Sequence, residues 1–119
     1  RAFLPLPMTR EELLLRHCRP QEGKIAFDRA QAERWLATIP DWKLNHAASG
    51  IERTFRFDDY YRTLAFVNAL AFIAHREDHH PDLEVGYNRC TVRFSTHSVE
   101  GLSENDFICA AQIDALQGS

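Results

Sequence analysis

The sequence predicts an α+β domain, in which a four-stranded antiparallel sheet carries three main helices on one face and a short helix precedes them. Two kinds of pattern lead to this prediction. Segments with apolar residues at helical spacing alternate with paired segments in which apolar residues occupy every second position. The 119 residues suffice for one domain with its own core. We expect residues 1–28 to form an N-terminal extension with the short helix, and residues 29–119 to form the main domain.

Capping motifs open the first two predicted helices. Thr9 and Glu12 have the spacing of a capping box, which predicts a short helix through about Arg16. Asp28 is a second capping residue and predicts a helix near 29–38. One face of this second helix carries the apolar residues Ala32, Trp35, Leu36 and Ile39.

The apolar period then changes from that of a helix to that of a strand. Trp42 and Leu44 predict a first strand, and residues 45–50 are rich in turn-forming residues. Residues 51–57 predict a second strand, so the two strands should form a hairpin. The inward face of the second strand consists of Ile51, Phe55 and Phe57, with Arg53 as a polar exception.

The longest predicted helix spans about 59–76, with Asp58 as its cap. Its apolar residues form two adjacent stripes, which is more than a surface helix needs. One stripe can pack on the sheet, whereas the second would leave an apolar patch in water, so we expect a homodimer or homotetramer. The first stripe consists of Leu64, Val67, Ala71 and Ala74, and the second of Phe66, Leu70 and Ile73.

A second hairpin and a final helix complete the predicted fold. Apolar residues alternate over 83–87 and again over 90–96, with a turn between them. We expect Tyr87 to lie in the core. Ser103 can cap the final helix. The apolar side of that helix consists of Phe107, Ala110, Ala111 and Leu116.

Composition excludes several classes of function. The formal net charge of -3 argues against a nucleic-acid partner. No apolar run approaches the roughly 18 residues of a membrane span, and residues 1–7 are too short an apolar run for a signal peptide. The three cysteines are widely spaced and form no C-x-x-C pair, so we expect reduced thiols, no thiolate zinc site and a cytoplasmic protein.

The histidines carry the strongest functional signal. His79 and His80 are adjacent and stand before Pro81, so both rings should project from a non-helical corner after the long helix. His97 follows the last strand and can meet them at one cleft. Three interpretations remain open: solvated loop histidines, a metal site, or acid–base catalysis in which one imidazole donates a proton and another accepts one. Adjacent histidines fit the facial geometry of zinc sites poorly, so no metal is expected.

The pattern around these histidines resembles the pterin-4a-carbinolamine dehydratases. The likeness covers about residues 29–117, and residues 17–23 are similar to the lead-in of some bacterial members. The motifs that carry it are His75 to Pro81, Tyr87, Ser95-Thr96-His97, Gly101 to Glu104 and Asp106, with Asp41-Trp42 and Phe55 to Asp58 before them.

The resemblance implies dehydration of 4a-hydroxytetrahydropterin to quinonoid dihydropterin, in the recycling of tetrahydrobiopterin. It implies a pterin substrate and no metal or organic cofactor. It gives His79 and His97 the role of proton transfer, without saying which is the acid. Substrate binding falls to His80, Pro81, His75, Asp78 and Asp106. Asp106 belongs to a capping-box pattern as well, so it is either a structural cap or an orienting group in the site.

Other functions stay open beside the dehydratase. Many animal members have an acid at the position of His75, Trp at Leu83 and Arg at Asn105, and these changes bear on substrate affinity more than on reaction type. Some animal relatives bind dimeric transcription factors, which gives a non-catalytic alternative as a dimerisation cofactor. A pterin-binding offshoot linked to molybdopterin is a further alternative.

Overall fold

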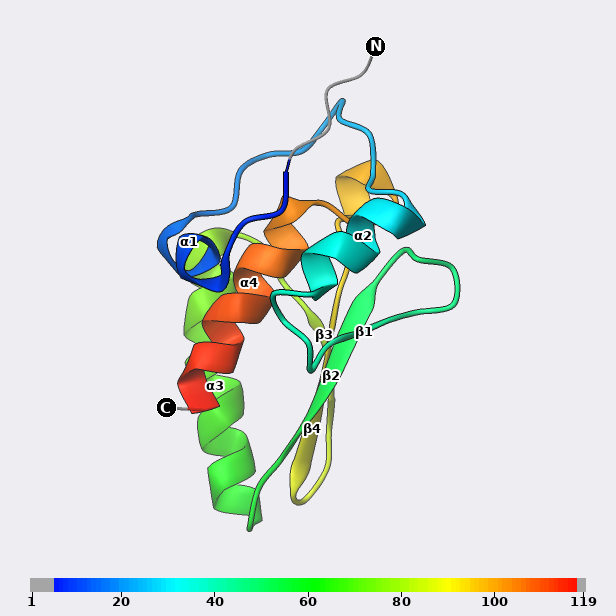
Figure 1. Cartoon of the computed structure of the whole chain (residues 1–119). Helices are drawn as coiled ribbons and strands as arrows, with labels where there is room; N and C mark the ends of the chain where they lie inside the picture. The colour runs from blue at the N-terminus through cyan, green and yellow to red at the C-terminus, as the bar shows by residue number, and fades with distance from the viewer. Residues whose placement is uncertain (1–5, 118–119) are drawn as a thin grey trace.

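The computed structural model describes residues 6–117, and the predicted α+β class is confirmed (Figure 1). Most of the segment in which we expected no signal peptide, residues 1–5, lies outside this range. Across residues 6–117, no helix combines the length and the apolar character needed to cross a bilayer. The elements in chain order are α1 (Arg10–Leu15), α2 (Arg29–Leu36), β1 (Lys43–Leu44), β2 (Ile51–Arg56), α3 (Tyr60–Glu77), β3 (Asp82–Val85), β4 (Arg89–Phe94), the 3₁₀ turn η1 (His97–Val99), α4 (Glu104–Asp114) and the 3₁₀ turn η2 (Ala115–Gln117).

The sheet has the strand order β1-β2-β4-β3, with every neighbouring pair antiparallel. The two predicted hairpins are both present, and β2 of the first pairs with β4 of the second, with Ile51 opposite Phe94. The helices lie to one side of this sheet (Figure 1). The pairing brings the end of β4 close to the end of α3, and that proximity positions the site described below.

Three of the four predicted helix caps are confirmed. The side chains of Thr9, Asp28 and Ser103 accept backbone hydrogen bonds at the starts of α1, α2 and α4. The prediction of Asp58 for the longest helix was wrong by one residue. Asp59 has the extended backbone of a cap, and its carboxylate accepts from the backbone N–H of Arg62 at 2.8 Å. α3 therefore begins and ends one residue later than predicted.

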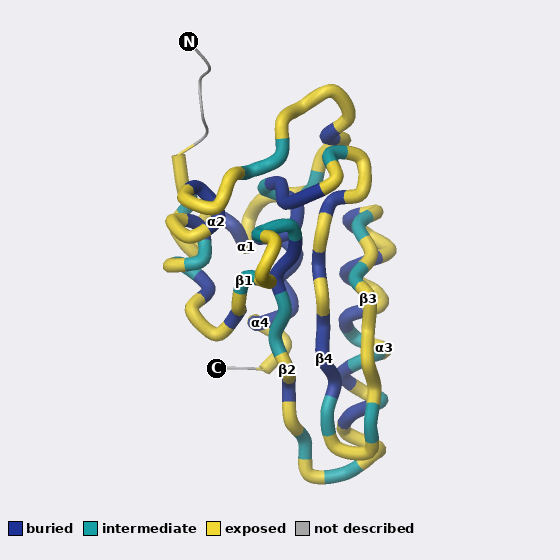
Figure 2. Tube along the Cα trace, turned by 90° about the vertical axis from the view of Figure 1, so that its right-hand side faces the viewer, coloured by how far each residue is buried: buried dark blue, intermediate teal, exposed yellow. Residues whose placement is uncertain are grey.

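Helix α4 is the centre of the molecule, as its buried course in Figure 2 shows. Every residue from 105 to 114 is buried, so polar side chains on this helix need partners inside the protein. Each has one. The polar members and their partners are Asn105 with Arg19, Asp106 with His79, Gln112 with Arg76, and Asp114 with Trp42 and Arg53.

The N-terminal segment packs against α4 and supplies part of the core. Leu13 on α1 is fully buried. The side-chain amide of Gln112 donates to the backbone oxygen of Arg16 at 2.9 Å. The ring of Phe27 contacts Phe107, with centroids 5.8 Å apart. The residues before α2 are thus tied to the main domain by both apolar and polar contacts.

Several predicted core residues lie at the surface, because they occupy the outer edge of the fold. Tyr87 is 64% exposed and stacks on Tyr60, with ring planes 11° apart. Leu116 is exposed beyond the end of α4. β3 is an edge strand, so Leu83 and Val85 remain exposed despite their alternation.

The two apolar stripes of α3 differ in burial. The stripe of Phe66, Leu70 and Ile73 is buried against the sheet and α4. In the other stripe Ala74 is buried, Leu64 and Val67 are half-buried, and Ala71 is exposed.

The polar exception on β2 is explained by an ion pair with α4. Arg53 donates to the buried carboxylate of Asp114 at 2.7 Å, and its guanidinium lies 4.3 Å from the centroid of the Phe55 ring. Burial raises the pKa of Asp114, even though Trp42 and Arg53 donate to its carboxylate. Arg53 therefore supplies the positive charge that pairs with the buried carboxylate of Asp114.

Candidate active site

The end of α3 fixes the first histidine. Asp78 adopts the left-handed conformation (φ 51°, ψ 43°), and the backbone N–H of His79 donates to Ala74 at 3.1 Å. The chain leaves the helix at the left-handed Asp78, and Pro81 then disfavours helical geometry in His80. His79 is thus held by the last turn of a long helix.

His79 and Asp106 form the central contact of the site. Nε2 of His79 lies 2.7 Å from Oδ1 of Asp106, and the two side chains are 11% and 0% exposed. The imidazole stacks parallel on Phe94, with centroids 5.6 Å apart and planes 5° apart. A ring that is stacked on one side and hydrogen-bonded at one edge has little freedom to rotate.

Asp106 serves as a cap and as an orienting group at once. Its Oδ2 accepts from the backbone N–H of Ser103 at 3.0 Å, which closes the capping box of α4, and from the hydroxyl of Thr96 at 2.8 Å. Its Oδ1 is left for His79. The capping contact therefore belongs to Oδ2 of Asp106, and the contact that can orient His79 belongs to Oδ1.

The same geometry assigns the tautomer of His79. An ionised carboxylate can only accept, so the ring must carry its proton on Nε2 when it is neutral. Within residues 6–117, Nδ1 of His79 has no hydrogen-bond partner. The lone pair of Nδ1 is then free to accept a proton.

His97 shares a hollow with His79. β4 ends at Phe94, Thr96 pairs with Gly101 in an isolated bridge, and His97 opens the turn η1. The exposed His97 side chain therefore stands at the rim of the sheet. The hollow has a volume of about 290 Å³. Its lining includes Asp78, His79, Thr96, His97 and Ser98 on one side, and Cys18, Arg19, Pro20, Gln21 and Glu22 of the N-terminal extension on the other, with Glu77 and Asn105.

Four of the predicted site residues do not line this hollow, and one of them, Asp106, lies behind His79. His80 is exposed and Pro81 half-buried beyond it, and His75 is exposed on the last turns of α3. His75 and His79 stand four residues apart, a spacing that binds metals within some helices, but α3 ends at Glu77 and the left-handed Asp78 lies between the two histidines. Within the described range 6–117, no three His, Cys, Asp or Glu side chains are grouped as a metal site would require.

Glu77 is a buried carboxylate that sequence reasoning did not single out. It accepts from the backbone N–H of Cys18 at 2.8 Å, and it contacts Nδ1 of His17 at 2.8 Å and the guanidinium of Arg76 at 3.2 Å. Burial acts to raise its pKa, but these hydrogen bonds outweigh burial and hold the pKa of Glu77 below its ordinary value. Glu77 lies in a polar stretch at a helix end, so nothing in the sequence set it apart from solvated neighbours.

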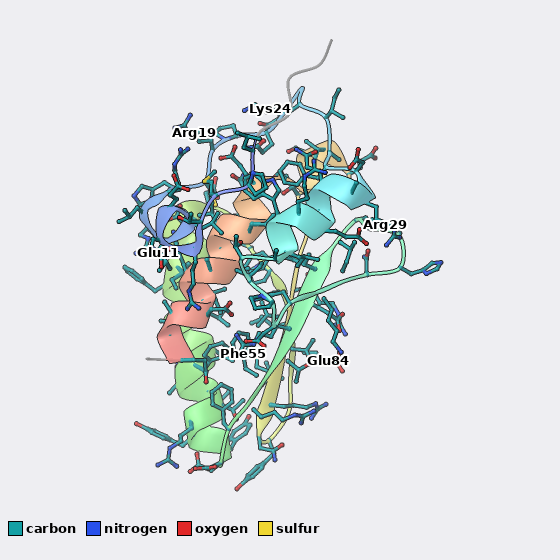
Figure 3. All side chains as sticks on the ribbon, in the orientation of Figure 1. Glu11, Arg19, Lys24, Arg29, Phe55 and Glu84 are labelled. Atoms are coloured by element: carbon teal, nitrogen blue, oxygen red, sulfur yellow. The ribbon has the colours of Figure 1, made fainter. Side chains whose placement is uncertain are left out.

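Asn105 is a second residue whose role only the structure reveals. Its Oδ1 accepts from the backbone N–H of Arg19 at 3.1 Å, and its Nδ2 donates to the backbone oxygen of Arg19 at 2.7 Å. Arg19 is labelled in Figure 3 on the segment that passes close to the start of α4. The extension thereby becomes one wall of the hollow.

The comparisons with known proteins identify the family. The family model described as Pterin 4 alpha carbinolamine dehydratase matches residues 26–116, so the chain belongs to this family. A protein of Xanthomonas campestris pv. campestris (strain 8004), provisionally named pterin-4-alpha-carbinolamine dehydratase, is 60% identical over 101 residues, which cover 84% of this chain and 86% of the relative. A protein of Xylella fastidiosa (strain 9a5c) with the same provisional name is 57% identical, with 84% and 87% covered.

Two solved structures are similar in fold. One, described as a transcriptional coactivator/pterin dehydratase from Brucella melitensis, has a TM-score of 0.74 at 29% identity and covers 78% of this chain and 99% of that one. The other, described as a pterin dehydratase-like protein and RuBisCO assembly factor in the α-carboxysome, has a TM-score of 0.58 at 26% identity and covers 66% and 92%. The predicted resemblance is therefore confirmed at the level of the family.

Proposed function

We propose that the protein dehydrates 4a-hydroxytetrahydropterin to quinonoid dihydropterin by histidine acid–base catalysis, in the recycling of tetrahydrobiopterin. One observation carries the proposal: His79 and His97 line the same hollow, with the buried Asp106 behind His79. Membership of the dehydratase family supports the reaction class. Three free thiols are in keeping with a reducing compartment, so we propose that it acts in the cytoplasm.

The reaction needs one proton delivered and one removed. Hydroxide is a poor leaving group, so an acid protonates the 4a-oxygen as the C4a–O bond breaks and water departs. The lone pair of N5 forms the C4a=N5 bond, which leaves a cation. A base then takes the proton from N5 and the neutral quinonoid product remains. Two imidazoles on one hollow can carry out both transfers.

The tautomer of His79 suggests a division of these roles. With Nε2–H engaged by Asp106, Nδ1 of neutral His79 can accept the N5 proton. His97, which is exposed, is then the donor to the departing hydroxyl. Asp78 on the rim is proposed to contact the pterin. His80, Pro81 and His75 are proposed to bind the part of the substrate that extends beyond the hollow.

The test measures the decay of 4a-hydroxytetrahydropterin with purified protein and no added metal. The wild type should accelerate the decay, and His79→Ala or His97→Ala should lower the rate by roughly 10² or more, on the scale of general acid–base catalysis. His46→Ala is the matched control, because His46 is exposed on the loop between β1 and β2 and lies outside the hollow lining. A wild type that leaves the decay at its spontaneous rate rejects the proposal.

A second candidate function is binding to another protein. The titles of the two similar structures name a transcriptional coactivator and an assembly factor. On this chain, Tyr61 and Phe72 of α3 are 82% and 65% exposed, so α3 offers apolar surface for a second copy or another protein. We propose that this surface forms a homodimer or homotetramer, and sedimentation that finds only monomer at micromolar concentration rejects self-association.

A further inference from the structure

Two cysteines 91 positions apart in the chain meet beside the hollow. Sγ of Cys18 lies 3.5 Å from Sγ of Cys109, so the thiols share a hydrogen bond. Cys109 is fully buried in α4, and Cys18 is half-buried in the extension, where it lines the hollow. One thiol of the pair is thus open to small molecules and the other is sheltered behind it.

We propose that Cys18 and Cys109 form an intramolecular disulfide when the protein meets a peroxide or a small-molecule disulfide, which would fasten the N-terminal extension to α4. This is a modification site separate from the proton-transfer chemistry. It does not depend on the proposed dehydratase activity.

The distance between the sulfurs allows the bond with a small movement. A disulfide is about 2.05 Å long, so the sulfurs must approach by roughly 1.5 Å. Cys109 is held by the central helix, whereas Cys18 lies in the irregular segment between α1 and α2. We therefore expect Cys18 and the extension around it to move, while Cys109 stays in place. The Cys18 thiol gives up its hydrogen bond to the backbone oxygen of Asn105, 3.6 Å away, whereas the bond from the Cys18 backbone N–H to Glu77 at 2.8 Å does not involve the sulfur.

The oxidation balances with peroxide as the oxidant. The Cys18 thiolate attacks one peroxide oxygen, the O–O bond breaks, and Cys18 becomes a sulfenic acid while hydroxide leaves. The Cys109 thiol then gives its proton to the sulfenic oxygen as its sulfur attacks the Cys18 sulfur, the S–O bond breaks, and the second oxygen leaves as water. Overall, two thiols and one hydrogen peroxide give one disulfide and two waters. A dithiol reagent reverses the change by exchange.

The three cysteines differ in reactivity. The hydrogen bond to Cys18 and, next, burial raise the pKa of Cys109, so this sulfur stays protonated and is not the first to be oxidised. Burial raises the pKa of Cys90, which is fully buried in β4. Oxidation should therefore begin at Cys18, and Cys90 should remain a thiol.

The experiment treats the full chain with hydrogen peroxide and measures thiols and mass. Wild type should lose two of its three thiols and about 2 Da, the mass of two hydrogens, with dithiothreitol restoring both. Peptide mapping should find Cys18 joined to Cys109. Closing so long a loop should raise the melting temperature by more than about 5 °C.

Single substitutions make the test specific. Cys90→Ser should behave as wild type, because Cys90 is outside the pair. Cys18→Ala and Cys109→Ala should each abolish the loss of two hydrogens, and Cys18→Ala keeps the buried part of the core intact. Stable oxygen addition at Cys18 without a cross-link, a cross-link to Cys90, or only intermolecular cross-links would each overturn the proposal.

Discussion

Replacing Asp106 by asparagine should reverse the tautomer of His79. Oδ2 of Asp106 accepts from the Ser103 backbone N–H, which cannot act as an acceptor, and from the Thr96 hydroxyl. The carbonyl oxygen of the asparagine must take that place, which turns its NH₂ group toward His79. Nε2 of His79 must then accept, and the ring proton moves to Nδ1. The nitrogen that we propose as the base loses its free lone pair.

The size of the effect follows from the contacts that change. A misplaced tautomer in a histidine–aspartate pair costs up to about 10⁴ in rate, so we expect a loss of roughly 10²–10⁴ in dehydratase rate. Hydrogen bonds to charged groups contribute about 1.5–3 kcal/mol and neutral ones about 0.5–1.5 kcal/mol. Three bonds become neutral but persist, each losing about 1–1.5 kcal/mol, so the free energy of unfolding should fall by about 3–4.5 kcal/mol. A typical domain has about 5–15 kcal/mol of stability, so the protein should stay folded.

The assay combines the reaction rate with NMR of imidazole nitrogens, which reports the tautomer without reference to activity. Asp114→Asn is the matched control, because Asp114 is also buried on α4 and its carboxylate accepts from Trp42 and Arg53 at one oxygen. It lies eight positions further along the helix, roughly 12 Å away, and should change stability without changing rate or tautomer. If His79 keeps its proton on Nε2 in Asp106→Asn, or if the rate stays within about twofold of wild type, the reasoning is refuted.

Three other substitutions test the rest of the structure. Folding lowers the pKa of Glu77, so the ionised Glu77 stabilises the protein above the ordinary carboxyl pKa near 4.5, and this stabilisation is lost as pH falls through the lower pKa of the folded state. In urea unfolding, Glu77→Gln should therefore make the free energy of unfolding depend less steeply on pH at acid pH. Leu13→Ala should cost about 2–5 kcal/mol in urea unfolding, because Leu13 is fully buried, whereas Leu15→Ala, 83% exposed, should cost under about 0.5 kcal/mol. Phe72→Ser should weaken self-association by at least about tenfold in sedimentation, because a 65% exposed phenylalanine adds apolar area to an interface.

Each of these expectations has a contrary outcome. A Glu77→Gln variant whose stability falls with acid as steeply as wild type would mean that other carboxylates govern the transition. Equal effects of Leu13→Ala and Leu15→Ala would mean that α1 does not belong to the cooperative core. An unchanged association constant for Phe72→Ser would move the interface elsewhere, with the edge strand β3 as the next surface to test.

Local signals in the sequence were enough to predict most of the fold. Capping residues and apolar periods depend on neighbours three or four positions away, so they identified the four α-helices of residues 6–117 and both hairpins, whereas the 3₁₀ turns η1 and η2 were not predicted. The wrong predictions concern burial, that is, which residues the rest of the fold covers. Tyr87 and Leu83 have the alternation of core residues, but burial depends on what covers a strand, and β3 is at the edge of the sheet. A sequence pattern gives the face of a strand and does not give its place in the sheet.

The candidate site was predictable only in its titratable residues. The sequence drew attention to His79, His80 and His97 through the chemistry of imidazole, whereas the pairing of His79 with His97 and the site role of Asp106 came from the resemblance to the dehydratase family. Glu77 could not be found in the same way, because its importance comes from a contact with Cys18, 59 positions away. The wall that the extension adds to the hollow was missed for the same reason. Contacts of this length leave no local pattern in a sequence.

Asn105 illustrates why a departure from a family pattern can be a structural requirement. Many animal members have arginine at this position, and arginine has five donors and no acceptor. The backbone of Arg19 presents one donor and one acceptor to residue 105, and the amide of Asn105 matches both, at 3.1 and 2.7 Å. An arginine here would remove the acceptor of this half-buried hydrogen bond from the Arg19 N–H, and such a bond contributes about 0.5–1.5 kcal/mol. The position of the extension therefore depends on Asn105, and Asn105 depends on the extension for its hydrogen bonds. Together they place the backbone of the extension beside the hollow, where many animal members have an arginine side chain.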